Sequence, residues 1–242
     1  MVISWNKPIF TGLLLLLFWL PPVYAGTVTF TAVQAVNIAD GMYSDSNLYS
    51  ESDIMINWGC NPGDEFCLEH APTTSQGLVQ FDLSSIPSGA TITNATLELY
   101  HSVNDGAGKI FDIFGNTSSW DETLVTYDTR PTTDAGASST LTIDDADYAQ
   151  GLYRDWDLTS LVQEWVSGTH ANFGVTLHER DETFENWIYF EGLNEDEYPP
   201  LLVITGDGLG GPGGVPEPAT FALLAGGFAV LGLVRARRRR AE

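Results

Sequence analysis

The sequence predicts an all-β protein: an antiparallel, jelly-roll-like β-sandwich with one short helix. Apolar and polar residues alternate at a period of two along most of residues 27–206. Glycine, proline, asparagine and aspartate interrupt this alternation at short intervals, as turns between strands do. The middle of the chain is also long enough to form one all-β domain with a core of its own. We expect a helical signal segment before the sandwich and a transmembrane helix after it.

Residues 1–25 have the order of a secretory signal peptide. Lys7 gives a basic start, the run IFTGLLLLLFWL is apolar, and Pro21 and Pro22 end it ahead of the small residues of VYA. We expect cleavage after Ala25. An uncleaved membrane anchor is the alternative, but the run is shorter than the about 20 apolar residues that span a bilayer.

Residues 26–206 are predicted to form the sandwich, with one helix in TSLVQEWVSG. Its apolar residues have helical spacing, Thr159 or Ser160 is the expected N-cap, and Gly168 is the expected end. We expect this helix to cover one end of the sandwich. The expected strands lie at 27–36, 53–58, 77–82, 91–101, 109–115, 152–158, 172–179, 186–192 and 200–206.

The chain of 242 residues carries a net charge of −22. Between Gly26 and Glu217 there are 31 acidic residues and only four basic ones, a net charge of −27. Such a surface repels nucleic acids and anionic lipids, so nucleic-acid binding is not expected.

Cys60 and Cys67 lie in the turn-rich sequence CNPGDEFC. Because export leads to an oxidising compartment, we expect a local disulfide between them. Half of a metal site is the alternative, for which His70 is the neighbouring candidate ligand.

A calcium site is the other metal chemistry that the sequence offers. Oxygen ligands gather in IADGMYSDSNLYSESD, although their spacing is not that of an EF-hand loop. A solvated acidic loop is the alternative. The candidate ligands are Asp40, Asp45, Asn47, Glu51 and Asp53.

No catalytic residues are predicted. The sequence has neither a G-x-S-x-G elbow nor an H-E-x-x-H helix. A glycosidase needs two carboxylates that face one sugar, but among so many acids close pairs such as Asp121–Glu122 arise by chance.

Sugar binding is better supported, because strand alternation turns aromatic and polar side chains to one side. Trp120, Trp156 and Trp165 are expected in the core instead. If the strands are neighbours, one face collects aromatic rings with carboxylates between them; the alternative is that these rings are covered and belong to the core. The candidate ligand-binding residues are Glu98, Tyr100, His178, Trp187, Tyr189 and Glu191.

The chain closes with three parts in a fixed order, after a glycine-rich linker at 207–214. Residues 215–242 hold Pro216, Glu217 and Pro218, then an apolar stretch from Ala219 to Val234. An arginine cluster follows, which would stay on the cytoplasmic side as a membrane stop. Its members are Arg235, Arg237, Arg238, Arg239 and Arg240.

This tail resembles the PEP-CTERM sorting signal of Gram-negative bacteria. The resemblance implies export through the inner membrane, transient anchoring, recognition by the membrane protease exosortase, and release to the cell surface or the exopolysaccharide matrix. A permanent C-terminal anchor is the alternative.

The middle of the chain resembles the DNRLRE domain family in four blocks: FDLSSIPSGATITNATLELY, WDETLVTYDTRP, DLTSLVQEWVSGTHANFGVTL and YPPLLVIT. The resemblance implies an extracellular β-sandwich related to carbohydrate-binding modules, some of which bind acidic polysaccharides such as alginate. The insertion CNPGDEFCLEHAPTTSQ departs from the family pattern.

Together these features predict a non-enzymatic surface or matrix protein that binds exopolysaccharide. An acidic module needs a bridging cation or aromatic stacking to hold an acidic glycan, since charge attraction is absent. The alternatives are a polysaccharide lyase or hydrolase, and a structural biofilm adhesin that binds no glycan.

Overall fold

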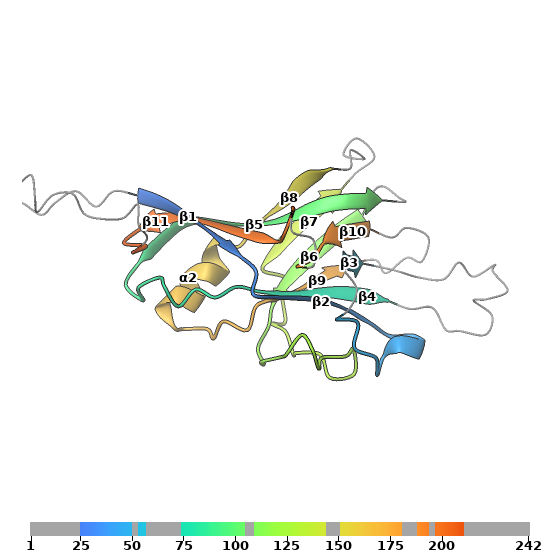
Figure 1. Cartoon of the computed structure of the whole chain (residues 1–242). Coiled ribbons are helices and arrows are strands. Elements are labelled where there is room, and N and C mark those ends of the chain that lie inside the picture. The colour runs from blue at the N-terminus through green and yellow to red at the C-terminus, as the bar shows by residue number, and fades with distance from the viewer. Residues whose placement is uncertain are drawn as a thin grey trace, which may run out of the picture. The chain divides into compact units, whose positions relative to one another are not determined.

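A computed structural model describes residues 25–49, 53–56, 74–104, 109–143, 151–180, 188–193 and 197–210. Within these residues two antiparallel sheets face each other, and a short helix lies beneath one end of the upper sheet (Figure 1). The predicted β-sandwich is therefore confirmed. Among the described residues no helix is long and apolar enough to cross a membrane. The expected signal peptide and C-terminal helix lie outside them.

The two sheets are here called sheet A and sheet B. In sheet A the strands follow the order β1-β11-β5-β10-β3, and β8 pairs with the other edge of β5; in sheet B the order is β2-β4-β9-β6-β7. Sheet A consists of β1 (Ala25–Thr31), β11 (Leu201–Asp207), β5 (Thr91–Asn104), β10 (Ile188–Glu191), β3 (Asp53–Ile56) and β8 (Leu152–Asp157). Sheet B consists of β2 (Gln34–Ala39), β4 (Ser75–Gln80), β9 (Val175–Glu179), β6 (Lys109–Gly115) and β7 (Ser139–Ile143).

Strand β5 is long enough to organise sheet A. One of its edges pairs with β11 along its first part and with β10 along its last part. Its other edge pairs with β8 from Thr96 to His101. Three separate stretches of sequence are thereby brought beside one strand.

The core lies between the sheets. Phe190 of β10 contacts Trp156 of β8 and Phe111 of β6 edge-on, with ring centroids 5.8 and 6.0 Å apart. Trp156 and Trp165 are buried as predicted, and Trp120 is partly buried against a smaller apolar cluster. The core also holds a buried ion pair, in which Lys109 Nζ lies 2.8 Å from Glu179 Oε1.

Helix α2 (Thr159–Ser167) confirms the predicted helix, including its end at Gly168, which has φ +77°. The predicted N-cap is wrong. The helix begins at Thr159 after Leu158, and neither Thr159 nor Ser160 caps it. Asp157, the last residue of β8, instead accepts hydrogen bonds from the backbone and hydroxyl of Thr159. A carboxylate just before the helix takes the role expected of the hydroxyls.

Helix α2 also provides hydrogen-bond acceptors for the first part of β5, where β8 no longer pairs with it. Beyond the end of β8, the backbone N–H of Ala95 donates to Thr159 Oγ1 (3.0 Å), and that of Ile92 donates to Gln163 Oε1 (2.8 Å). The helix thus satisfies β5 backbone N–H groups on the edge where β8 has already ended, and it covers one end of the sandwich as expected.

Two strand predictions need correction. The expected strand at 27–36 is two strands, because the chain crosses from sheet A to sheet B at Ala32 and Val33. Ala32 N donates to the backbone oxygen of Pro200, which directly precedes β11 of sheet A. Val33 N donates to the backbone oxygen of Gln80 on β4 of sheet B. Strand β7 was not predicted, although its sequence STLTI has an alternating pattern. Both errors concern how a polar-apolar alternation is cut into strands.

Candidate functional site

The outer face of sheet A is built by the alternation of β5. Leu97, Leu99 and His101 are buried between the sheets, so Glu98 and Tyr100 point to the outer side. Both outward side chains are only partly buried. The predicted orientation of these two residues is confirmed.

Three tyrosines gather on this face and are here called the tyrosine cluster: Tyr100, Tyr153 and Tyr198. Tyr153 lies opposite Tyr100 in the β5–β8 register and meets its ring edge-on, at 5.3 Å and 74°. Tyr198, just before β11, stacks on Tyr100 with ring centroids 3.9 Å apart and planes 8° from parallel. Two sequence-distant segments and β5 therefore supply one aromatic surface.

Carboxylates border the tyrosine cluster. Glu98 lies opposite Asp155 in the β5–β8 register. Burial, and then the charge of Asp155, raise the pKa of Glu98. Tyr198 donates a 2.8 Å hydrogen bond to Glu197, and this bond together with the carboxylate charge raises the pKa of Tyr198 to about 12. Burial raises the pKa of Tyr153 as well, so the hydroxyls of Tyr153 and Tyr198 stay protonated beside the carboxylates of this face.

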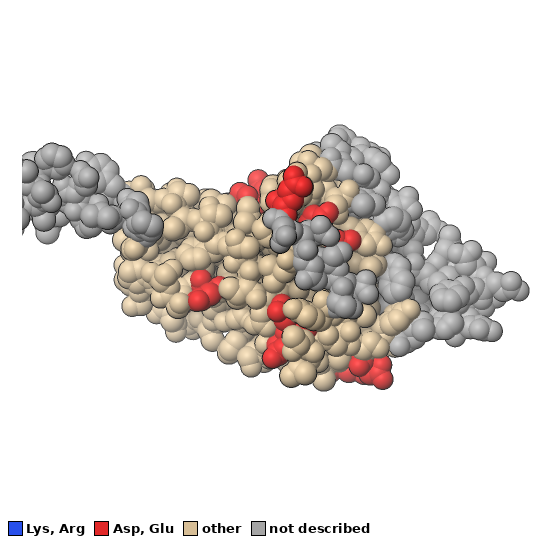
Figure 2. All heavy atoms as spheres, viewed as in Figure 1, with Lys and Arg blue, Asp and Glu red and all other residues tan. Residues whose placement is uncertain are grey.

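The surface charge agrees with this composition. On the face drawn in Figure 2, acidic side chains form separate patches, and no Lys or Arg is visible among the described residues. The described surface in this view thus offers carboxylate acceptors to a ligand but no visible cation that would attract an anion.

Tyr189 and Glu191 lie further along the same sheet. They alternate with Ile188 and Phe190, which are buried in the core, and so point to the outer face on β10. Tyr189 is bound to β5 through its backbone oxygen, which accepts a hydrogen bond from the Ser102 hydroxyl. These two predicted residues therefore share the outer face of sheet A with Glu98 and Tyr100. Trp187 lies outside the described residues.

The expectation that His178 joins this face is wrong. His178 lies on β9, which belongs to sheet B, and its neighbour Asp112 on β6 is also in that sheet. Its ring contacts Phe114 edge-on at 6.4 Å, on the outer side of sheet B. The alternation of the strand was read correctly, but which sheet it joins was not.

The outer face of sheet B is covered where β2 and β4 lie. Val36, Ile38 and Leu78 turn outward there and pack with Val125, while Trp120 and Tyr127 lie against them. Hydrogen bonds secure this cover: Trp120 Nε1 donates to Phe173 O, and Glu122 accepts from Ala35 N. The segment WDETLVTYDTRP is therefore a structural cover in this fold.

Described members of the calcium set have partners elsewhere in the fold. Asp40 accepts a hydrogen bond from the backbone of Thr74, and Asn47 donates to the backbone oxygens of Glu122 and Val125. Asp53 lies on β3 opposite Glu191. Among the described residues no group of three His, Cys, Asp or Glu side chains could hold a metal. Glu51 lies outside these residues, and calcium binding stays a prediction.

Several other predicted residues also lie outside the described part of the chain. They are Cys60 and Cys67 of the expected disulfide, Pro216, Glu217 and Pro218 of the sorting motif, and the arginines at 235 and 237–240.

Three residues of the outer face of sheet A were not predicted from the sequence. Tyr153 and Asp155 alternate with buried Trp156, so the period of LYRDWD was sufficient to turn them outward. Tyr198 precedes two prolines and lies outside any strand. The residues around it do not indicate that its ring stacks on Tyr100 of β5.

Comparison with known families gives a match for both the sandwich and the tail. Residues 26–206, well over half of the chain, match the sequence profile of carbohydrate-binding module family 96. Residues 214–240 match the PEP-CTERM protein-sorting motif. A comparison with curated proteins gave no significant match. The resemblance to a PEP-CTERM protein with a carbohydrate-binding-module-like sandwich is confirmed.

Proposed function

Because the chain belongs to carbohydrate-binding module family 96, we propose that the tyrosine cluster on sheet A is its polysaccharide-binding surface. The stack of Tyr198 on Tyr100 carries this proposal. A tyrosine offers a flat apolar ring and a polar tip, which suits a sugar whose C–H face is apolar and whose rim bears hydroxyls. Glu98, Asp155 and Glu197 supply acceptors for those hydroxyls at the border of the rings.

The ligand is a neutral region of exopolysaccharide. An acidic glycan would bring its charge against the carboxylates of Glu98 and Asp155, which lie side by side on β5 and β8. Repulsion at such short separation opposes binding unless a cation lies between the groups. Neutral sugars meet no such barrier, and aromatic stacking does not depend on charge.

The chain binds this glycan without cleaving it. A family of carbohydrate-binding modules points to a binding domain, and the tyrosine cluster presents rings and carboxylates on a sheet face. Viscosity measurements on a polysaccharide solution incubated with the purified chain test this. A loss of viscosity would indicate a lyase or hydrolase instead.

The PEP-CTERM motif implies export, processing by an exosortase and transient anchoring in the membrane, toward the cell surface. The finer location that we propose is the outer surface or exopolysaccharide matrix of a Gram-negative bacterium. There the sandwich would link the released protein to the surrounding glycan.

Affinity electrophoresis of the full-length chain in mild detergent tests the binding proposal. The gels contain the producer's own exopolysaccharide, a neutral glucan, a neutral mannan or alginate. We expect retardation by the first or by a neutral polymer, weakened in the Tyr100→Ala and Tyr198→Ala variants. Tyr49→Ala is the matched control, because Tyr49 is an exposed tyrosine of the loop after β2. Unchanged mobility of the wild type in every gel contradicts the proposal.

Cell fractionation with C-terminal peptide mass spectrometry tests the sorting proposal. We expect the secreted protein to lack the arginines at 235 and 237–240. Replacing Pro216, Glu217 and Pro218 by alanine should keep the whole tail on a membrane-bound protein. Secreted protein that still carries the arginines would exclude release by cleavage.

A further inference from the structure

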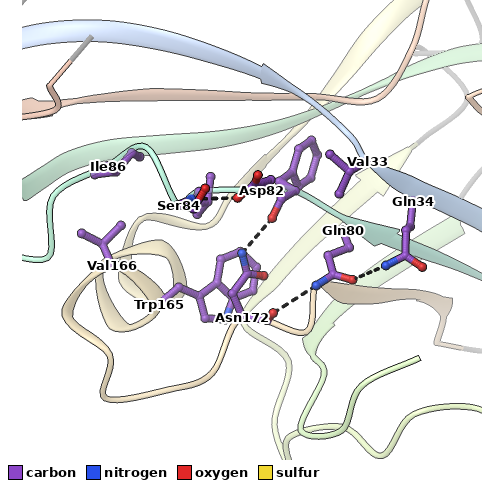
Figure 3. A pocket seen from close by; sticks show the side chains of 11 residues that line it. Val33, Gln34, Gln80, Asp82, Ser84, Ile86, Trp165, Val166 and Asn172 are labelled. Atoms are coloured by element: carbon purple, nitrogen blue, oxygen red, sulfur yellow. Dashed lines mark hydrogen bonds between the residues drawn. The ribbon is translucent and has the colours of Figure 1, made fainter. Parts of the chain in front are cut away.

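A pocket of about 460 Å³ lies away from the tyrosine cluster, where the chain crosses from sheet A to sheet B (Figure 3). Its walls come from the β1–β2 crossing at Val33, the end of β4 with the loop after it, and the second half of α2. This volume is within the range of about 300–1,000 Å³ that small-molecule sites occupy. The pocket shares no residue with the outer face of sheet A.

One wall is apolar and aromatic. Trp165 and Val166 of α2 face Ile86 of the loop after β4, and all three are largely buried. The indole Nε1 of Trp165 is buried and has no acceptor within hydrogen-bonding distance among the described residues. Val33, by contrast, is 50 % exposed, so it stands at the mouth of the pocket.

Another part of the lining is a chain of three side-chain amides, joined through side-chain and backbone oxygens. Gln34 Nε2 donates to Gln80 Oε1 at 2.8 Å, and Gln80 Nε2 donates to Asn172 O at 3.1 Å. Asn172 Nδ2 in turn donates to Phe81 O at 2.8 Å. Figure 3 shows these bonds linking one side of the pocket. Each NH2 group has two hydrogens and uses one here, so each keeps one donor in a fixed position.

The ends of the chain of amides are also held. The Glu122 backbone N–H donates to Gln34 Oε1, and the Gly174 backbone N–H donates to Asn172 Oδ1, both at 3.1 Å. Donors held in this way lose little side-chain freedom when a ligand binds, which favours affinity.

Asp82 is the one charged side chain among the described residues that line the pocket. Hydrogen bonds from the Ser84 hydroxyl and backbone N–H lower the pKa of Asp82, so this exposed carboxyl stays ionised as an acceptor. A ligand that suits these walls has hydroxyls to donate to Asp82, oxygens to accept from the amides and an apolar face for Trp165. An anionic sugar would be repelled.

We propose that this pocket is a second saccharide site, which takes one or two units of an uncharged glycan. The proposal rests on the proposed function only in its class of ligand, because the two sites have no residue in common. The tyrosine cluster would hold a long chain across an open sheet face, while the pocket would bind a short segment or an end.

Calorimetric titration of the full-length chain in mild detergent tests the pocket with four probes: cellohexaose, maltohexaose, laminarihexaose and mannohexaose. We expect the wild type to bind at least one of them. Val33→Phe should weaken this binding at least about tenfold by filling the mouth of the pocket. Leu124→Phe is the matched control, since Leu124 is 72 % exposed and does not line the pocket. Equal melting temperatures show that both variants fold.

A second variant leaves the shape of the pocket unchanged. Asp82→Asn keeps an oxygen for the Ser84 N–H but removes the charge, so hexaose affinity should fall several-fold, because charged acceptors form the stronger hydrogen bonds. If neither Val33→Phe nor Asp82→Asn changes hexaose affinity, or if the wild type binds no hexaose, the pocket proposal is overturned.

The variant Tyr198→Ala separates the two proposals. Weaker polysaccharide retention in Tyr198→Ala, with hexaose binding unaffected by both Val33→Phe and Asp82→Asn, overturns the pocket and leaves the tyrosine cluster supported. Loss of hexaose binding in Val33→Phe, with polysaccharide retention unaffected in Tyr100→Ala and Tyr198→Ala, supports the pocket and overturns the tyrosine cluster.

Discussion

Tyr198 lies flat on Tyr100, with ring centroids 3.9 Å apart and ring planes 8° from parallel. Tyr100 belongs to the central strand of sheet A, whereas Tyr198 precedes β11, so the stack ties a connecting segment to the sheet. Since Tyr198 covers one face of Tyr100, we expect a sugar ring to stack on the other face of Tyr198. The pair then acts as one platform that is thicker than a single tyrosine.

The platform predicts that the ring of Tyr198 matters more than its hydroxyl. Tyr198→Phe loses the hydrogen bond to Glu197 but keeps the stack, and its retention by a neutral polysaccharide should remain close to the wild type. Tyr198→Ala should weaken binding by about 1 kcal/mol, roughly fivefold in Kd. Affinity electrophoresis over a series of polysaccharide concentrations measures both. Equal losses in Tyr198→Phe and Tyr198→Ala would argue for the hydroxyl instead.

Glu98 predicts a pH-dependent difference in stability. Because its pKa is raised in the folded protein, mainly by burial, its charged form opposes folding. Glu98→Gln should therefore be more stable than the wild type at pH 7. This advantage should shrink as the pH falls through the folded pKa and vanish below 4.5, the ordinary value. Urea unfolding of both proteins at several pH values gives the difference.

Thr96→Val is a suitable control for that series, because Thr96 lies on the same outer face of β5 and does not titrate. Its stability difference from the wild type should be the same at every pH. A difference for Glu98→Gln that grows toward acid would contradict the sign of the pKa shift.

Gly206 and Gly26 offer a matched test of packing, because they lie opposite each other in the β1–β11 register. A Cβ at Gly206 would clash with the backbone oxygen of Thr91, whereas a Cβ at Gly26 would have nothing within 4 Å. Gly206→Ala should therefore lower the free energy of unfolding by about 1–3 kcal/mol. Gly26→Ala should leave it unchanged or raise it by about 0.4–1 kcal/mol. Thermal unfolding ranks the two variants, and equal effects would refute the close approach at Gly206.

The calcium prediction is tested by titration calorimetry and by the melting temperature. If the loop after β2 binds calcium, the ion should release or absorb heat and raise the melting temperature, since a ligand of the folded state stabilises it. Asp45→Asn should reduce both effects, and Asp155→Asn on sheet A should not. If calcium addition to the wild type produces no heat, the prediction of calcium binding is contradicted.

Local patterns in the sequence were sufficient for most of the secondary structure and for recognising the tail. Period-two alternation identified most strands and turned Tyr100 and Glu98 outward. Helical spacing before a glycine located α2. These predictions succeed because the orientation of a side chain in a strand or helix depends on its immediate neighbours. The three-part order of the tail is likewise a local property of the chain, and the PEP-CTERM match agrees with it.

The tertiary structure alone decided which residues meet. His178 has the alternation expected of an outward residue, but its strand pairs within sheet B. Tyr198 has no strand pattern, and yet it completes the aromatic surface. The split of the first strand depends on Pro200 and Gln80, which lie far along the chain from Ala32 and Val33. Pairing between strands is set by contacts between distant segments, and the periodicity of one segment does not show which segment it pairs with. The sequence by itself therefore determined most of the elements and the faces of their side chains. Only the tertiary structure decided which faces form a site.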